Sequence, residues 1–167
     1  MRHLVPYWGT RRRLEALVAC GWPVSVLEAR IGSPSLFRRL GRRPRIRREW
    51  AEAVVRLYEE LWDVPPPDGP ESRRARARGE RHGWPRPMEW DDELLDLPPD
   101  ELAAAVAARV AAMDRLELAA CATARYREGD RSPVIVAAAK AYKRLLQADV
   151  RRRRRAERER ARLGVAA

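Results

Sequence analysis

Arginine and serine side chains that could bind the phosphates and base edges of a nucleic acid are concentrated over residues 33–48. The run 38–48 contains no acidic residue, so nothing within it neutralises its arginines. A planar guanidinium can donate two parallel hydrogen bonds to a phosphate or to the edge of guanine, and a serine hydroxyl can donate one. The chemistry that this segment predicts is therefore anion binding rather than catalysis.

Two short helices are expected before this segment. Apolar residues recur at the spacing of one helix face after Thr10, whose hydroxyl suits an N-cap, and Gly21 should end this first helix. Pro23 is tolerated in a first helical turn and should begin a second helix, which Gly32 ends. The arginine-rich segment would then follow a tight turn.

A third short helix is expected to carry the side chains that read the bases. Ser33 and Pro34 combine a capping hydroxyl with a proline at a position that needs no donor, which predicts a helix from Pro34 to about Leu40. Phe37 and Leu40 are three residues apart and should pack inward. The alternative is a helix that only packs, with solvated arginines. The outward positions, which are the candidates for base contacts, are Ser35, Leu36, Arg38 and Arg39.

A longer fourth helix is expected over about 45–62, with apolar residues on one stripe that completes a small core. Basic side chains around the third helix would hold the nucleic-acid backbone, because phosphate contacts position a protein while base contacts specify the sequence. The candidates for phosphate contacts are Ser33, Arg42, Arg43, Arg45, Arg47 and Arg48.

Segment 9–62 resembles the helix-turn-helix domain of lambda-repressor-like regulators, in the form found in actinobacteria and their phages. The likeness rests on Gly-Thr-Arg-Arg-Arg-Leu at 9–14, on Leu-Glu-Ala-Arg-Ile-Gly-Ser-Pro-Ser at 27–35 and on Leu-Tyr-Glu-Glu-Leu-Trp at 57–62. Two features depart from the family: Glu28 replaces a small alanine, and the turn that follows lacks an apolar residue. The resemblance implies a sequence-specific regulator of transcription that binds double-stranded DNA, a repressor that reads two half-sites as a dimer.

Residues 65–97 are expected to connect two domains, 1–64 and 98–167. The prolines at the start of this connector each remove a backbone donor and bias the preceding residue toward extended geometry, so a helix cannot continue there. Trp84 and Trp90 should pack on a neighbouring helix. The arginine-rich stretch before them is either a basic arm that reaches DNA or a solvated helix face. Its basic residues include Arg73, Arg74, Arg76 and Arg78.

The C-terminal region has a helical pattern throughout. Asp114 suits the cap of a second helix in this region, although one continuous helix from Pro99 fits as well. Ser132 and Pro133 repeat the cap-and-proline start and should begin a long basic terminal helix. Alanine-rich faces permit close helix contact within the chain or between protomers, so a homodimer is expected. The terminal helix carries a run that is either a phosphate-binding extension or a solvated tail, namely Arg151, Arg152, Arg153, Arg154 and Arg155.

The chain of 167 residues has a net charge of +11, and both of its ends are basic. Binding of such ends to duplex DNA should depend strongly on salt, because neutralised phosphates release counterions. Cys20 and Cys121 have no companions at metal-ligand spacing, and the sequence contains no phosphate-binding glycine loop and no activated nucleophile. We therefore expect no metal, no cofactor, no small-molecule substrate and no enzyme activity. No apolar run is long enough to cross a bilayer, which predicts a cytoplasmic, nucleoid-associated protein.

The sequence thus predicts an all-α protein, with an N-terminal helix-turn-helix bundle and a C-terminal helical region. Its preferred function is the DNA-binding regulator described above. The alternative is an oligomeric DNA-packaging or nucleoid-type assembly protein that binds duplex DNA with little sequence preference. A third interpretation is a protein-interaction adaptor that has lost DNA binding.

Overall fold

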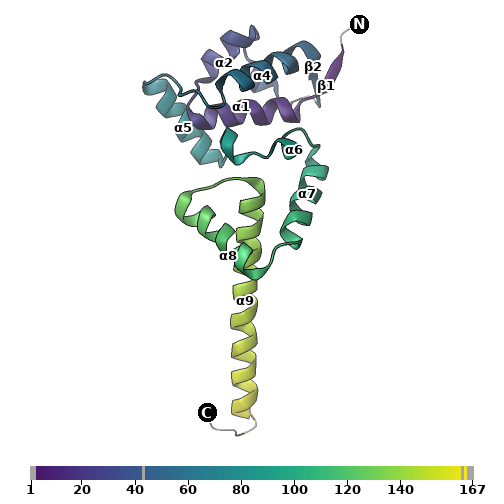
Figure 1. Ribbon diagram of the computed structural model, residues 1–167, viewed down its shortest axis with the longest axis vertical. Helices are drawn as coiled ribbons and strands as arrows, with labels where there is room; N and C mark the ends of the chain where they lie inside the picture. The colour runs from purple at the N-terminus through teal and green to yellow at the C-terminus, as the bar shows by residue number, and fades with distance from the viewer. Residues whose placement is uncertain (1–2, 43, 163, 165–167) are drawn as a thin grey trace. The chain divides into compact units, whose positions relative to one another are not determined.

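The computed structural model describes residues 3–42, 44–162 and 164, and this part of the chain is all-α apart from one small sheet (Figure 1). The sheet pairs β1 (Leu4–Pro6) with β2 (Arg45–Arg47) in antiparallel register, with Val5 opposite Ile46. The chain divides into two compact units, Met1–Val106 with Arg131–Pro133 and Ala107–Asp130 with Val134–Ala167. None of the described helices is both long and apolar enough to cross a membrane.

The first helix, α1 (Trp8–Cys20), lies at the centre of the first unit and is buried along most of one side. Gly21 ends it in the left-handed region, at a φ of 118°, as the sequence predicts. The expected N-cap is wrong: Thr10 lies inside the helix and is 4% exposed. The helix begins earlier because the carbonyl of Tyr7 already accepts a hydrogen bond from the backbone N–H of Arg11 at 2.9 Å.

The second and third helices are α2 (Val24–Ile31) and α3 (Leu36–Arg39). Gly32 ends α2 in the left-handed region, as expected. The third helix is shorter than the predicted 34–40, because Ser35 has a φ of 61° and a helix cannot run through that conformation. The shorter helix turns Leu36 inward, where it is 0% exposed. The prediction that Leu36 points outward is therefore wrong.

The fourth helix, α4 (Arg48–Leu61), begins three residues later than the predicted 45–62. The reason is that Arg45–Arg47 pair with β1, so Ile46 reaches the core from a strand and not from a helix. Val54, Leu57 and Leu61 form the buried stripe of α4. The glutamates outside the stripe are exposed, as expected.

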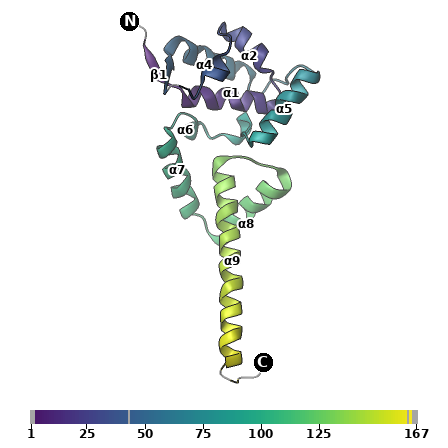
Figure 2. The same cartoon turned by 180° about the vertical axis from the view of Figure 1, so that it is seen from behind.

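The structure differs from the expected connector over 65–97. Helix α5 (Pro70–His82), the 3-10 turn η1 (Pro87–Glu89) and helix α6 (Asp92–Leu95) belong to the first unit and pack on α1 (Figures 1 and 2). The helices α1 and α5 cross closely where a Cβ on Gly79 would stand 2.6 Å from the Cα of Ala19. Trp84 and Trp90 are partly buried against the same core, which confirms their predicted packing. Helix α4 ends at Leu61, before the prolines, and the chain then folds back onto α1.

The second unit begins within α7 (Pro99–Ala111) and continues through α8 (Arg115–Thr123), the π-helical turn η2 (Ala124–Glu128) and α9 (Pro133–Arg162). Asp114 caps α8, because its side chain accepts the N–H of Glu117 at 2.8 Å, so the two-helix alternative is confirmed. A small core forms around Leu118, Cys121 and Ala138. Beyond residue 149 the described side chains of α9 are exposed.

Candidate nucleic-acid interface

The turn between α2 and α3 is held by the carboxylate of Glu28. Its Oε2 accepts the backbone N–H of Ser35 at 2.9 Å, and its Oε1 accepts the N–H of Phe37 at 2.9 Å. The first N–H groups of a helix have no partner within the helix and need an acceptor from elsewhere. Glu28 therefore supplies, from the preceding helix, the cap that Ser33 was expected to supply. Leu27 and Leu36 pack beneath the turn, each at most 1% exposed.

The two arginines of α3 differ in the number of hydrogen bonds that their guanidinium groups make within the chain. Arg38 is exposed, and its only polar contact among the described residues is with the hydroxyl of Ser35, at 3.4 Å. The guanidinium of Arg39 donates to the carbonyl of Pro34 at 2.8 Å and to the hydroxyl of Ser33 at 3.0 Å. Arg38 is thus the residue of α3 whose donors remain available for a base edge, while Arg39 braces the turn.

Trp50, which the sequence placed only on an apolar stripe, holds two of the candidate arginines. The guanidinium carbon of Arg39 lies 5.0 Å from the centre of its ring, and that of Arg47 lies 4.8 Å away. Arg47 also pairs with Glu49 at 3.1 Å. A guanidinium over an indole face gains electrostatic attraction and loses side-chain freedom. Trp50 therefore fixes a pair of positive charges beside α3. Arg47 and Trp50 are three residues apart, but no sequence pattern indicates the contact between Trp50 and Arg39.

The remaining candidates for phosphate contacts separate into three groups. Arg42, Arg45 and Arg48 are exposed on the segment that leads from α3 through β2 into α4. Ser33 is 2% exposed and already bonded to Arg39, so the structure does not support a phosphate contact from its hydroxyl. Arg43 lies outside the described residues.

The accessory basic residues of α5 also have different surroundings. Arg76 is bound to the end of α1, because its Nε donates to the carbonyl of Cys20 at 3.0 Å. Arg78 lies over two aromatic rings, with its guanidinium carbon 4.9 Å from the centre of Phe37 and 5.5 Å from that of Trp84. Arg73 and Arg74 are exposed.

The basic run of α9 belongs to the second unit, and all five of its arginines are exposed. One of them, Arg152, pairs with Asp149 at 2.6 Å, and Asp149 also pairs with Arg115 at 2.9 Å. These two guanidinium groups hold the pKa of Asp149 below its ordinary value. Nothing in the described part of the chain covers the other four arginines, which are Arg151, Arg153, Arg154 and Arg155.

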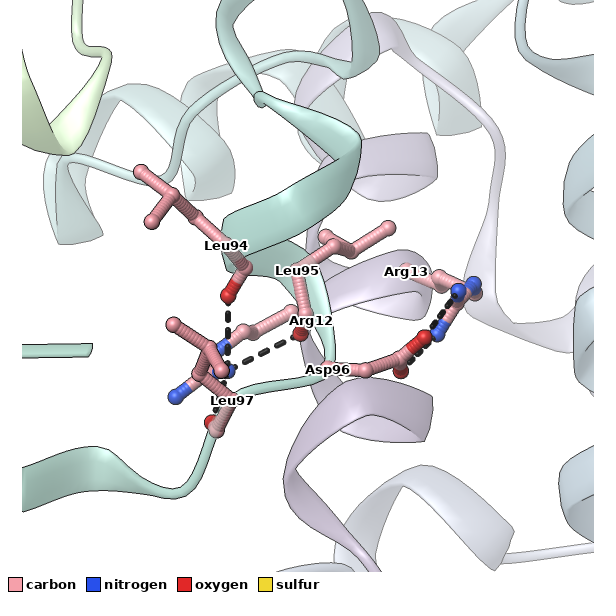
Figure 3. A network of polar contacts seen from close by, with 6 residues as sticks. All are labelled: Arg12, Arg13, Leu94, Leu95, Asp96 and Leu97. Atoms are coloured by element: carbon pink, nitrogen blue, oxygen red, sulfur yellow. Dashed lines mark hydrogen bonds and ion pairs between the residues drawn. The ribbon is translucent and has the colours of Figure 1, made fainter. Parts of the chain in front are cut away.

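Two arginines of the 9–14 motif bind residues 94–97 of the same unit (Figure 3). One terminal nitrogen of Arg12 donates to the carbonyls of Leu95 and Leu97 at 2.9 and 2.6 Å, where α6 ends. Burial lowers the pKa of Arg12, although Asp96 opposes this effect. Arg13 forms a paired contact with Asp96, at 2.5 and 2.8 Å, which holds the pKa of that carboxyl below its ordinary value.

The space around Gly9 explains why this motif begins with a glycine. A Cβ at that position would collide with the carboxylate of Asp96, and Arg13 would be close to it as well. The motif therefore docks α6 onto α1. Arg12 and Arg13 are structural residues of the first unit and do not belong to the candidate interface.

None of three comparisons, with protein-family models, with curated proteins and with solved structures, gives a significant match to this chain. The candidate interface is thus defined by the chain's own geometry.

Proposed function

We propose that the chain is a sequence-specific regulator of transcription, a repressor that binds double-stranded DNA through α3 and the arginines beside it. In this proposal Arg38 contacts a base edge in the major groove. Arg42, Arg45 and Arg48 contact phosphates on the same duplex. The protein would act on the nucleoid as a homodimer.

The observation that carries the proposal is the combination of a fixed turn with free arginines. Glu28, Leu27 and Leu36 hold α3 against α2. The one carboxylate at this turn accepts backbone N–H groups and forms no ion pair with Arg38. A short rigid element with unneutralised arginines fits bidentate contact with guanine and simple ionic contact with phosphate.

Selection of bound duplexes from a random library tests sequence preference directly. The affinities of Arg38→Ala and Arg45→Ala are then measured on the selected duplex and on a scrambled one. Arg45→Ala removes an equal charge from an exposed residue of β2. Loss of a bidentate base contact costs about 1–3 kcal/mol on the matched base only. Arg38→Ala should therefore weaken binding to the selected duplex by roughly 5- to 150-fold and binding to the scrambled duplex much less.

Loss of a phosphate contact has a different signature. Arg45→Ala should weaken binding to both duplexes alike. It should also make the slope of log affinity against log salt shallower by about 0.9. Equal losses on both duplexes for both variants, with no enriched sequence, would reject the regulator and favour a packaging protein. No binding by the wild-type chain at low salt would reject both.

The packaging function is a second candidate because of α9. Its exposed half carries a dense set of arginines beside Leu145, Leu146 and Val150, which are 37%, 41% and 48% exposed. Exposed apolar side chains next to positive charge suit an oligomer that binds DNA through charge alone. The same apolar side chains support the proposed homodimer.

A further inference from the structure

A groove of about 600 Å³ lies beside α3, between that helix and α5. Helices α1 and α2 also contribute to its walls. Its lining is basic and aromatic, and the basic side chains that reach it are Arg11, Arg38, Arg78 and His82. The sequence did not indicate this groove, because its α3 and α5 walls come from segments about forty residues apart.

The position of Arg78 in the groove is fixed by rings. Its guanidinium lies over Phe37 and Trp84, and the rings of Phe37 and Trp84 meet edge to face with centres 5.7 Å apart. His82 stacks on Trp84 at 4.8 Å, with an angle of 14° between the rings. Such stacking orients a guanidinium while its N–H donors stay in the plane of the group. Among the described residues, no acceptor takes those donors.

The groove has one carboxylate among the side chains that line it, and that carboxylate forms no ion pair with the arginines of the groove. Its one carboxylate, Glu28, already accepts two backbone N–H groups. Arg11 pairs with Glu15 at 2.7 Å, so it contributes less than the other two arginines. Arg38 and Arg78 therefore face the groove without an ion-pair partner among the described residues.

We propose that this groove binds a phosphate group, supplied by the backbone of the same duplex that α3 contacts. Arg78 would donate to the phosphate oxygens, since a guanidinium matches a phosphate with two parallel hydrogen bonds. Arg38, on the α3 side of the groove, keeps the base contact proposed above and adds positive charge there. The rings are already in contact with Arg78, His82 and one another, so they support the cation and are not a platform for a base. This inference rests on the proposed function and extends its DNA contact from α3 to α5.

The test compares Arg78→Gln with Arg73→Gln, which removes the same charge from the same helix at an exposed position that does not line the groove. Affinity for a duplex is measured from about 50 to 200 mM salt. Arg78→Gln should make the slope of log affinity against log salt shallower by about 0.9, the value for one lost phosphate contact. Arg73→Gln should leave that slope unchanged. Equal slopes for the two variants would overturn the inference.

A second measurement uses the wild-type chain and does not require the glutamine variant to fold. The Nε–H NMR signal of Arg78, assigned with Arg78→Lys, should shift when duplex DNA is added. Inorganic phosphate is titrated in parallel. A shift with phosphate but none with DNA would overturn the duplex as the source of the phosphate.

The two proposals fail in distinguishable ways. DNA binding with an unchanged slope in Arg78→Gln would overturn the groove contact and leave the proposed function standing. Absence of duplex binding by the wild-type chain would overturn both.

Discussion

The side chain of Glu28 in α2 accepts a hydrogen bond from the backbone N–H of Phe37 in α3, at 2.9 Å. The other oxygen of the same carboxylate accepts from Ser35. An acid therefore stands where the resemblance led us to expect a small alanine, and it caps the next helix from outside. The short turn allows Glu28 to act as this cap, because the turn brings the first residues of α3 within hydrogen-bond distance of α2.

Removal of this cap should destabilise the first unit. Glu28→Ala leaves the N–H groups of Ser35 and Phe37 without an acceptor, and loss of a helix cap costs about 1 kcal/mol. Urea unfolding followed by circular dichroism measures the change. Glu52→Ala, which removes an exposed glutamate of α4, should change the free energy of unfolding by less than about 0.5 kcal/mol. Equal effects of the two variants would contradict the capping role.

The crossing of α1 and α5 predicts an unusual result for a glycine in a helix. Replacing such a glycine with alanine normally stabilises by about 0.5–1 kcal/mol. Gly79→Ala should instead destabilise by about 1–3 kcal/mol, because the new Cβ meets the backbone of Ala19 and the helices must separate. Adding Ala19→Gly should not restore stability, since the nearest atom is a Cα. A double variant as stable as the wild type would contradict this account. Thermal unfolding provides the measurement.

The ion pair between Arg13 and Asp96 predicts a dependence of stability on pH. Arg13 depresses the pKa of Asp96 below the ordinary 3.8, so the pair stabilises the fold above that pH and the stabilisation is lost as pH falls through the lower folded value. Asp96→Asn should lower Tm at pH 7 and reduce its fall between about pH 5 and 2. Asp68→Asn, at an exposed loop residue, should leave the profile unchanged. The same profile in both variants would exclude the pair as the cause.

The exposed apolar residues of α9 predict a change in oligomeric state. Replacing Leu145 and Leu146 with serine removes apolar surface that a second protomer would cover, so sedimentation should show a lighter species than the wild type. Leu116→Ser, at a residue that is 78% exposed on α8, is the matched control and should sediment as the wild type does. A wild type that is already monomeric would contradict the proposed homodimer.

Local rules in the sequence predicted the C-terminal ends of α1 and α2 and the cap of α8, but not the first residues of α1, α3 and α4. Gly21 and Gly32 end their helices because only glycine enters the left-handed region at little cost, and Asp114 caps α8 through contacts within its own turn. The short sheet was missed because β1 and β2 pair residues about forty positions apart. The proline-rich break was predicted, but the return of α5 to α1 depends on a close approach at Gly79 that no local pattern encodes.

The candidate interface was predicted less completely than the fold. Composition identified the arginines. All three of Arg38, Arg39 and Arg45 are exposed, and hydrogen bonds to its own turn distinguish Arg39 from the other two. Leu36 was misplaced because one residue with a positive φ rotated the helix that follows it. The roles of Trp50 and Arg78 depend in part on contacts between different elements, Trp50 with Arg39 and Arg78 with Phe37, so side-chain type alone could not assign them.

The fold of the first unit has a consequence for proteolysis of the chain. The proline-rich stretch between α4 and α5 is largely exposed, so a protease could cut it at Asp68. The two fragments on either side of the cut would stay associated, because α5 crosses α1 at Gly79 and Arg76 donates a hydrogen bond to the carbonyl of Cys20. The nicked protein would migrate as one particle in native buffer and separate into fragments only in denaturant.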